Sequence, residues 1–221
     1  ALSGSGSIGT SSGLLNAATF DISATTSGAT ITTLSGAGSV VLGTKTLTLS
    51  AANDTFAGVI SGTGGLVLSS GTQTLTGNNT YTGGTTINGG TLSFGANDVL
   101  SNTGAVNVSG GTLAIGAFTD SVGAVTLSSG SITGTTGGVL TGASYDVTNA
   151  TGTTTIGAIL GGTAQLTKTG AGSLVMSGMN QYTGITTITS GTLALSGSGS
   201  IGTSSGVSNA ATFDISATTS G

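Results

Sequence analysis

The sequence has no cysteine, histidine, arginine, glutamate, tryptophan or proline, and these absences exclude most kinds of reactive site before any motif is considered. General acid–base pairs and metal centres are built mainly from histidine, cysteine and the two carboxylates. In 221 residues the only charged side chains are six aspartates and two lysines. We therefore expect no enzymatic activity, no cofactor and no metal site.

The charge of the chain also limits the classes of partner that it can bind. Its net charge is −4, and Lys45 and Lys168 are its only basic side chains. Neutralising nucleic-acid phosphates requires several basic residues on one surface, so we expect no nucleic-acid partner. No apolar run approaches the roughly 18 residues of a membrane helix, and no signal peptide is recognisable. We expect no membrane span in this segment, which we interpret as an internal piece of a longer chain.

Glycine is abundant, at 43 residues, and together with serine and threonine it would suit a disordered linker. The apolar residues argue against that alternative, because they alternate with small polar residues in short runs. Such alternation places every second side chain on one face of a strand. The runs end at SG, GG and NG pairs, which favour sharp turns, and no stretch has helical periodicity. The sequence therefore predicts an all-β protein. The runs include Phe20 and Ile22, Leu47 and Leu49, Leu66 and Leu68, Leu92 and Phe94, Val106 and Val108, and Leu174 and Met176.

A long repeat links the two ends of the sequence. Residues 194–221 repeat residues 1–28 and differ only where Leu14 and Leu15 become Val207 and Ser208. The period is 193 residues, so we divide the chain into one tandem unit, residues 1–193, and the start of the next, residues 194–221. We expect both copies to have the same local conformation, one unit apart along a common axis, and the chain to continue past residue 221.

Shorter repeats lie inside this unit. Residues 66–95 and 166–196 align with an offset of 101, and residues 106–116 reuse their GTL element. Repeats that cannot bury their own apolar face gain a core by stacking on their neighbours.

The string TGNNTYTGGTTINGGTL, residues 76–92, resembles the autotransporter-associated β-strand repeat of type V secreted passenger proteins. The second copy departs from it at Gln181 and Ile185, which replace Thr80 and Gly84. The resemblance implies a right-handed parallel β-helix, or β-solenoid, that is extracellular or held at the bacterial outer-membrane surface.

Elementary physics favours the same fold. Apolar residues would stack inside successive rungs while Thr, Ser and Asn cover the outside. With about 20 residues per rung, one unit would contain nine or ten rungs. At a strand spacing of about 4.8 Å it would advance about 45 Å. A β-sandwich is the competing fold, but antiparallel hairpins do not require near-identical rungs.

Each candidate site also has a structural interpretation. The GxGxxG pattern is expected by chance in a glycine-rich chain, and no helix follows it to hold a phosphate. Four aspartates could bind calcium, but none lies in a dense acidic loop, so we expect turn-capping roles. The patterns are Gly4, Gly6 and Gly9, and Gly197, Gly199 and Gly202; the aspartates are Asp54, Asp98, Asp120 and Asp146.

Tyr81 and Tyr182 occupy equal positions in the two short repeats. We expect each to cap the end of a rung, with its ring packed and its hydroxyl in water, in preference to an adhesive role. Asn78, Asn107 and Asn149 satisfy the N-glycosylation pattern, which is frequent by chance in a chain rich in Asn and Thr.

Three functions fit these features. The first is a structural segment, the shaft of a cell-surface or extracellular fibre, which self-associates or stacks end to end. The second is an adhesin module that contacts a host, a surface or neighbouring cells. The third, an ice-binding solenoid, would need the Thr-x-Thr motifs at 30–32, 46–48 and 72–76 to share one flat face, and their irregular spacing disfavours this.

Overall fold

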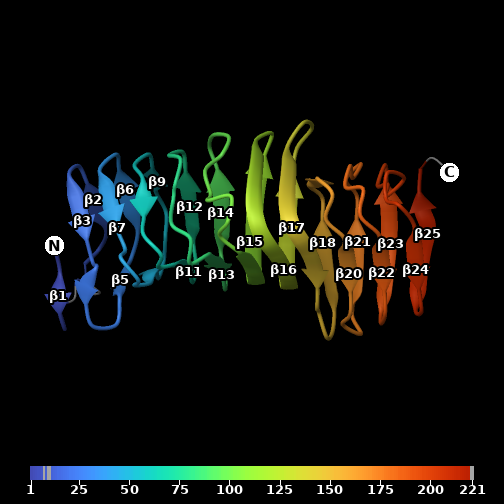
Figure 1. The fold of residues 1–221 in the computed structure, drawn as a ribbon, viewed down its shortest axis with the longest axis horizontal. Helices are drawn as coiled ribbons and strands as arrows, with labels where there is room; N and C mark the ends of the chain where they lie inside the picture. Colours follow the sequence, from blue (N-terminus) through green and yellow to red (C-terminus); the bar gives the residue numbers. More distant parts are fainter. Residues whose placement is uncertain (7, 9–10, 220–221) are drawn as a thin grey trace.

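The chain coils into a rod of stacked rungs. The computed structural model describes residues 1–6, 8 and 11–219, and this part of the chain contains strands and turns but no helix. All its strand pairings are parallel, which gives a β-solenoid of about 11 turns with the termini at opposite ends (Figure 1). The predicted parallel β-helix is confirmed. A β-sandwich is excluded because its hairpins would require antiparallel pairs.

The strands form three faces, which we call the first, second and third face. The first face contains β5 (Ala29–Ile31), β8 (Leu47–Leu49), β11 (Leu66–Leu68), β13 (Thr85–Ile87), parts of β15 (Val106–Gly116), β16 (Thr119–Gly134) and β17 (Val139–Val147), β20 (Leu166–Lys168), β22 (Thr186–Ile188) and β24 (Val207–Asn209). The second face contains β2 (Leu14–Asn16), β6 (Leu34–Gly36), β9 (Thr55–Phe56), β12 (Thr72–Leu75), β14 (Thr91–Phe94), the ends of β15 and β16, β18 (Thr153–Ile156), β21 (Ser173–Met176), β23 (Thr192–Gly197) and β25 (Thr212–Thr218). The third face contains β3 (Thr19–Asp21), β7 (Ser39–Val41), β10 (Ile60–Ser61), the starts of β16 and β17, and β19 (Ile159–Gly161). Between the third and first faces, β1 (Ser3–Gly4) pairs with β4 (Ala24–Thr25).

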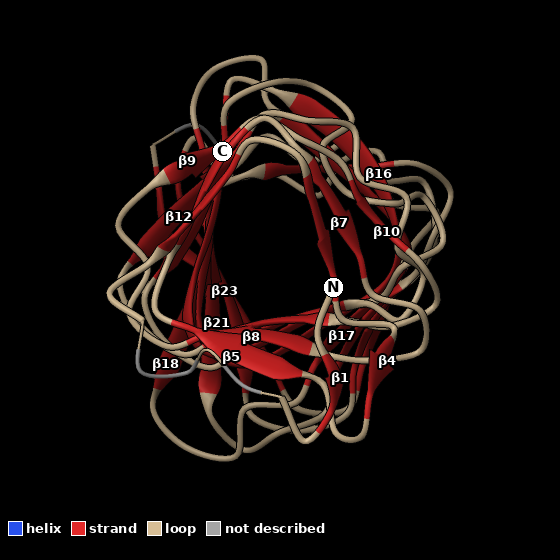
Figure 2. Ribbon diagram, turned by 90° about the vertical axis from the view of Figure 1, so that its left-hand side faces the viewer, coloured by secondary structure: helices blue, strands red, loops and turns tan. Residues whose placement is uncertain are grey.

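The solenoid is right-handed. Figure 2 looks along the axis from the N-terminal end, and the path from β8 to β9 to β10 runs clockwise as it recedes from the viewer. Right-handed crossovers are also the rule for parallel strands.

Rung length varies around the expected value. Thr30 pairs with Thr48, 18 residues later, whereas Thr86 pairs with Asn107, 21 residues later. The extra residues are taken up at the corners, because the paired strands themselves stay in register. Averaged over the first face, a rung has about 20 residues, as the repeat lengths indicated.

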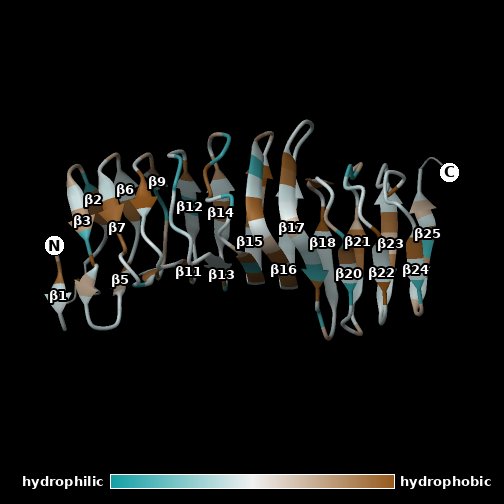
Figure 3. Cartoon of the chain, in the orientation of Figure 1, coloured by the Kyte–Doolittle hydropathy of each residue, from teal (hydrophilic) through white to brown (hydrophobic). Residues whose placement is uncertain are grey.

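The interior is filled by columns of alternating side chains. Figure 3 shows brown apolar bands alternating with paler ones along the strands. The buried part of one inward column on the first face is apolar in every rung but one, where it contains Lys168. Its buried members, in axial order, are Ile31, Leu49, Leu68, Ile87, Val108, Leu127, Val147, Lys168 and Ile188.

The two copies of the 28-residue repeat have the same local structure. Gly6 N–H donates to Ser3 O at 3.0 Å, and the equivalent bond in the second copy, from Gly199 to Ser196, measures 2.9 Å. The pairing of Ser3 with Ala24 likewise recurs in the second copy at the same spacing. The expected common conformation is therefore confirmed among the described residues of the two copies.

Their stacking differs by one face. In the first copy β2 belongs to the second face, where it pairs with β6. The equivalent residues of the second copy form β24, which pairs with β22 on the first face. On the second face, β23 lies nine turns after β2. From β23 the chain passes the third face and reaches β24 on the first face, which adds two-thirds of a turn. One unit thus spans nine and two-thirds turns.

Candidate functional site

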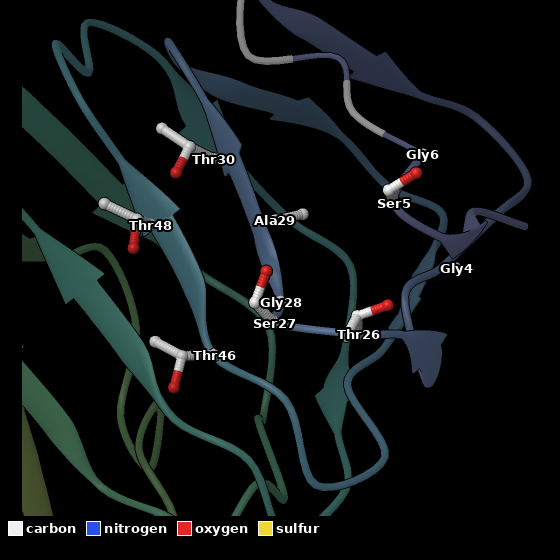
Figure 4. A pocket seen from close by; sticks show the side chains of 10 residues that line it. All are labelled: Gly4, Ser5, Gly6, Thr26, Ser27, Gly28, Ala29, Thr30, Thr46 and Thr48. Atoms are coloured by element: carbon white, nitrogen blue, oxygen red, sulfur yellow. The ribbon is translucent and has the colours of Figure 1, made fainter.

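An open groove lies beside the first face near the N-terminal end of the rod. Its volume is about 430 Å³, and Figure 4 shows the hydroxyl groups of its threonines and serines around it. Among the side chains that line it, none is charged and none is aromatic. Its lining residues are Gly4, Ser5, Gly6, Thr26, Ser27, Gly28, Ala29, Thr30, Thr46 and Thr48.

The chemistry of this groove is limited to neutral hydrogen bonding. Thr30 and Thr48 are neighbours in the β5–β8 ladder and point outward, so their hydroxyls reach the same side of the sheet. Hydroxyls both donate and accept hydrogen bonds, which suits an uncharged, hydroxyl-rich ligand. They supply neither a general base nor a metal-binding carboxylate.

The groove continues into an outward ladder on the first face that the sequence analysis missed. Six of its ten positions are threonine, with Val67, Asn107, Asp146 and Ser208 between or after them. The signal that could have found it is the middle residue of each short apolar triplet, such as LTL or TTI. The threonines are Thr30, Thr48, Thr86, Thr126, Thr167 and Thr187.

The three Thr-x-Thr motifs do not share one face. Thr30 pairs with Thr48, so the motifs at 30–32 and 46–48 are displaced from each other by two residues. The motif at 72–76 begins in β12, on the second face. The arrangement that an ice-binding interpretation required from these motifs is therefore absent.

The two repeat tyrosines are buried, and the prediction of water-exposed hydroxyls is wrong. The hydroxyl of Tyr81 lies 2.6 Å from Thr85 Oγ1, and that of Tyr182 lies 2.8 Å from Thr186 Oγ1. The rings are 1% and 0% exposed. Because burial disfavours the phenolate, it raises the pKa of Tyr182 to about 12 and that of Tyr81 further. These residues have the structural role expected, but inside the core.

Two of the four aspartates expected to cap turns accept hydrogen bonds from side-chain hydroxyls instead. Asp54 accepts a hydrogen bond from Thr33 Oγ1 at 3.0 Å, and Asp146 accepts one from Ser144 Oγ at 2.8 Å. Asp98 has a left-handed backbone, with φ of 52°.

Turn capping occurs at two other aspartates. Asp21 accepts from the Ser23 N–H at 2.8 Å, and Asp214 repeats this bond in the second copy. In the part of the chain that the structure describes, no three His, Cys, Asp or Glu side chains gather closely enough to hold a metal ion.

The remaining motifs divide between surface and core. Of the first GxGxxG pattern, Gly4 and Gly6 line the groove and Gly9 lies outside the described residues. Gly197 has the same positive φ as its counterpart Gly4, 56° against 57°. Asn78 is exposed and Asn107 points outward, but Asn149 is 1% exposed, which hides it from a glycosylating enzyme in the folded chain.

Lys168 is a buried charge that the sequence analysis did not anticipate. Its side chain is fully buried, and its ammonium group donates to Gly170 O. Burial lowers the pKa of this amine, because the charged form loses hydration. Its position in the alternating pattern, two residues after Leu166, was the available signal.

Comparison with known proteins identifies the short repeats. The model of the passenger-associated-transport-repeat family matches residues 68–94, 95–115 and 166–195. The three matched segments together cover about a third of the chain, and each is similar to a passenger-associated-transport-repeat. Two of the three matched segments contain the buried tyrosines, which explains why Tyr81 and Tyr182 recur at equal positions.

One curated protein gives a second comparison. Over 75 residues, or 31% of this chain, the sequence is 40% identical to the Adhesin BmaC autotransporter of Brucella suis biovar 1 (strain 1330). The chain covers 2% of that protein's length. No solved structure matches the chain. No helix in the described residues is long and apolar enough to cross a membrane.

Proposed function

We propose that this chain is a non-enzymatic segment of an exported autotransporter-like passenger and forms the shaft of an extracellular or cell-surface fibre. The observation that carries the proposal is the 193-residue repeat, whose two copies make the same local hydrogen bonds within one continuous solenoid. A unit that ends as it began can be added repeatedly, and each addition lengthens the rod without changing its cross-section. The passenger-associated-transport-repeats support export to the outside of the cell.

The one-face displacement adds a geometric feature to this shaft. A second unit built like the first would be turned by a third of a revolution, because β24 starts it on the first face and β2 started the first unit on the second face. Each surface feature of a unit would then point in one of three directions along the fibre.

Solution scattering from chains of one, two and three units tests the shaft. We expect each added unit to increase the length by about 45 Å while the radius of gyration of the cross-section stays constant. A cross-section that grows with the number of units would reject the shaft.

We also propose that the 221-residue segment, when isolated, associates end to end with a second copy that takes the place of the next unit. Ile22 is fully buried, but its counterpart in the second copy, Ile215, is 55% exposed. Ile215 lines an apolar groove of about 440 Å³ with Val207 and Phe213. Apolar surface beside an unpaired strand edge favours pairing with another parallel rung.

Sedimentation experiments test this contact. Ile215→Asp should abolish the concentration-dependent association. Leu15→Asp, at a residue 75% exposed on the N-terminal rung, should leave it unchanged. Unchanged association of Ile215→Asp would exclude this contact.

Adhesion is the second candidate function, favoured by the similarity to an autotransporter adhesin and by the hydroxyl-lined groove. The ligand class that fits the groove is a neutral carbohydrate. Replacing Thr30 and Thr48 with valine should remove binding to immobilised neutral glycans. The same replacement at Thr167 and Thr187, on the same face but far from the groove, should leave it intact. Equal binding by both variants would exclude the groove as the adhesive site.

A further inference from the structure

Three buried polar side chains occupy the same position in different rungs, near the corner between the second and third faces. They are Asn79, Asp120 and Asn180, with exposures of 1%, 3% and 4%. In each, one side-chain oxygen accepts a hydrogen bond from a backbone N–H of the preceding rung, at 2.7, 2.9 and 3.0 Å respectively. Each side chain therefore holds its own rung to the preceding one.

The two asparagines also hold the following rung. Asn79 Nδ2 donates to Val99 O at 2.7 Å, and Asn180 Nδ2 donates to Ser200 O at 3.0 Å. In both, the same nitrogen makes a further bond to the carbonyl two residues earlier in the chain, at 3.0 and 2.9 Å. The amide thus connects three consecutive rungs.

Asp120 makes only half of this connection. Its Oδ2 accepts from the Leu100 N–H, but Oδ1 is buried without a hydrogen-bond partner. Oδ1 corresponds to the amide nitrogen of the asparagines, which is the donating atom. An ionised carboxylate has acceptors only, whereas a protonated carboxyl has one O–H donor. An unpaired buried polar atom is costly, so this site favours the proton.

The surroundings favour the protonated form for a second reason. Burial raises the pKa of Asp120 to about 6 from its ordinary value of 3.8, against the opposing effect of the backbone N–H groups of Leu100, Val99 and Ser121. The neighbouring Asp98 carboxylate raises that pKa further by repulsion. The other titratable group that faces Asp120 is the buried Tyr81, two rungs earlier, which is neutral in this pH range.

We propose that Asp120 is a proton-operated clamp between rungs. When protonated, it donates from Oδ1 and connects three rungs as Asn79 and Asn180 do; when ionised, it holds only the preceding rung and weakens the rod there.

The raised pKa of Asp120 determines whether stability rises or falls with pH. A carboxyl group with a raised pKa in the folded state binds its proton more tightly when folded, so its stabilising contribution is complete below about pH 3.8 and is lost as the pH rises through about 6. This pKa difference corresponds to a change of about 100-fold in the unfolding equilibrium constant. Asp21 and Asp214, whose pKa values are lowered by hydrogen bonds from Ser23 and Ser216, act in the opposite sense and below this pH range.

The test compares urea unfolding of the whole chain from pH 4 to pH 8 with that of Asp120→Asn. We expect the parent chain to lose stability between pH 4 and 7 and Asp120→Asn to remain nearly constant and become the more stable of the two at pH 7. Asp98→Asn is the matched control, since asparagine tolerates the left-handed backbone. It should keep the pH step and move its midpoint to lower pH. Asn79→Asp should introduce a second step.

Hydrogen exchange provides a local readout that does not require reversible unfolding. The Val139 amide lies in the following rung and donates to Phe118 O at 3.1 Å. It should exchange faster above pH 6 than its intrinsic rate alone explains, whereas the Leu100 amide should stay protected by its bond to Asp120 Oδ2. Asp120→Asn should remove the excess at Val139. The proposal fails if the parent chain and Asp120→Asn have the same pH dependence, or if Val139 exchange in the parent chain follows only the intrinsic rate.

Discussion

The ring of Tyr145 lies 6.0 Å from that of Tyr182, with the two planes inclined at 50°. This tilted contact joins a first-face residue of β17 to the turn between β21 and β22. Aromatic pairs at this spacing stabilise a core by about 1 kcal/mol beyond their buried area. The two hydroxyls, however, have different partners, and removing them should have different costs.

Tyr145→Phe should destabilise the chain more than Tyr182→Phe. The Tyr145 hydroxyl accepts a hydrogen bond from the Gly142 N–H at 2.7 Å. Phenylalanine would leave this buried N–H without that acceptor, which should lower the free energy of unfolding by about 1–3 kcal/mol. Without the Tyr182 hydroxyl, Thr186 keeps its contact with Ser204 Oγ at 3.0 Å, so the cost should be about 1 kcal/mol. Urea unfolding of both variants at neutral pH measures the difference, and the reverse order would contradict these hydrogen-bond assignments.

Burying a charge in the core should be far more damaging than removing one from the surface. Leu92 and Ile87 are fully buried, so replacing either with aspartate should cost more than about 3 kcal/mol. Lys45→Ser removes only an exposed hydrogen bond to Thr26 O and should cost less than about 1 kcal/mol. Denaturant titration at low and high salt provides the comparison, with little salt effect expected on the parent chain. Equal costs for the core and surface variants would show that Leu92 and Ile87 are not interior.

Lys168→Met should stabilise the rod at neutral pH, because methionine fills the same space between Val147 and Ile188 without a buried charge. Replacing buried charges with apolar groups typically gains about 1–4 kcal/mol. The lowered pKa means that the unfolded chain binds the proton more tightly, so the parent chain should gain stability as the pH rises toward 10.5. The variant should lack this gain. A destabilised Lys168→Met with an unchanged alkaline profile would mean that the ammonium group reaches water.

Gly90 should not tolerate a side chain. Its φ is +72°, and a Cβ there would collide with the backbone of Gly71 in the preceding rung. We expect Gly90→Ala to cost about 2 kcal/mol or more through strain and displacement of the rung. At Gly206 a Cβ would meet no atom within 4 Å, and its φ is not in the left-handed region, so Gly206→Ala is the matched control and should be nearly neutral. Thermal unfolding measures both, and equal melting temperatures would contradict the close stacking at this corner.

The sequence was sufficient for the fold because inward and outward positions alternate along each strand. Leu92 and Ile87 could be placed in the interior on that basis, and the repeats gave a rung of about 20 residues. Alternation does not reveal which of the three faces a strand joins, because that depends on how many residues each corner absorbs. The one-face displacement of the second copy could not be predicted for this reason.

The buried polar residues could not be predicted from the sequence for a different reason. Asn79 lies between β12 and β13, where no regular alternation distinguishes an inward side chain from a loop residue. Asp120 alternates with the buried Val122 at the start of β16, but an aspartate is not expected at an inward position. The hydroxyl partner of Tyr81 is four residues later, across a glycine turn whose geometry only the fold defines. Sequence reasoning therefore placed the tyrosine rings correctly in a structural role but left their hydroxyls in water.

The most direct test of the solenoid and its repeat uses the natural absence of cysteine. Thr187 and Ser208 are register partners on the first face, so cysteines at these two positions should form a disulfide under mild oxidation, since neighbouring in-register strands bring their Cα atoms within reach. Ala194 lies on the second face, where it pairs with Asp214, and a cysteine there should not be linked to one at position 208. We predict cross-linking of the 187–208 pair alone. Cross-linking of the 194–208 pair, with none at 187–208, would contradict both the register of the rod and the one-face displacement between its units.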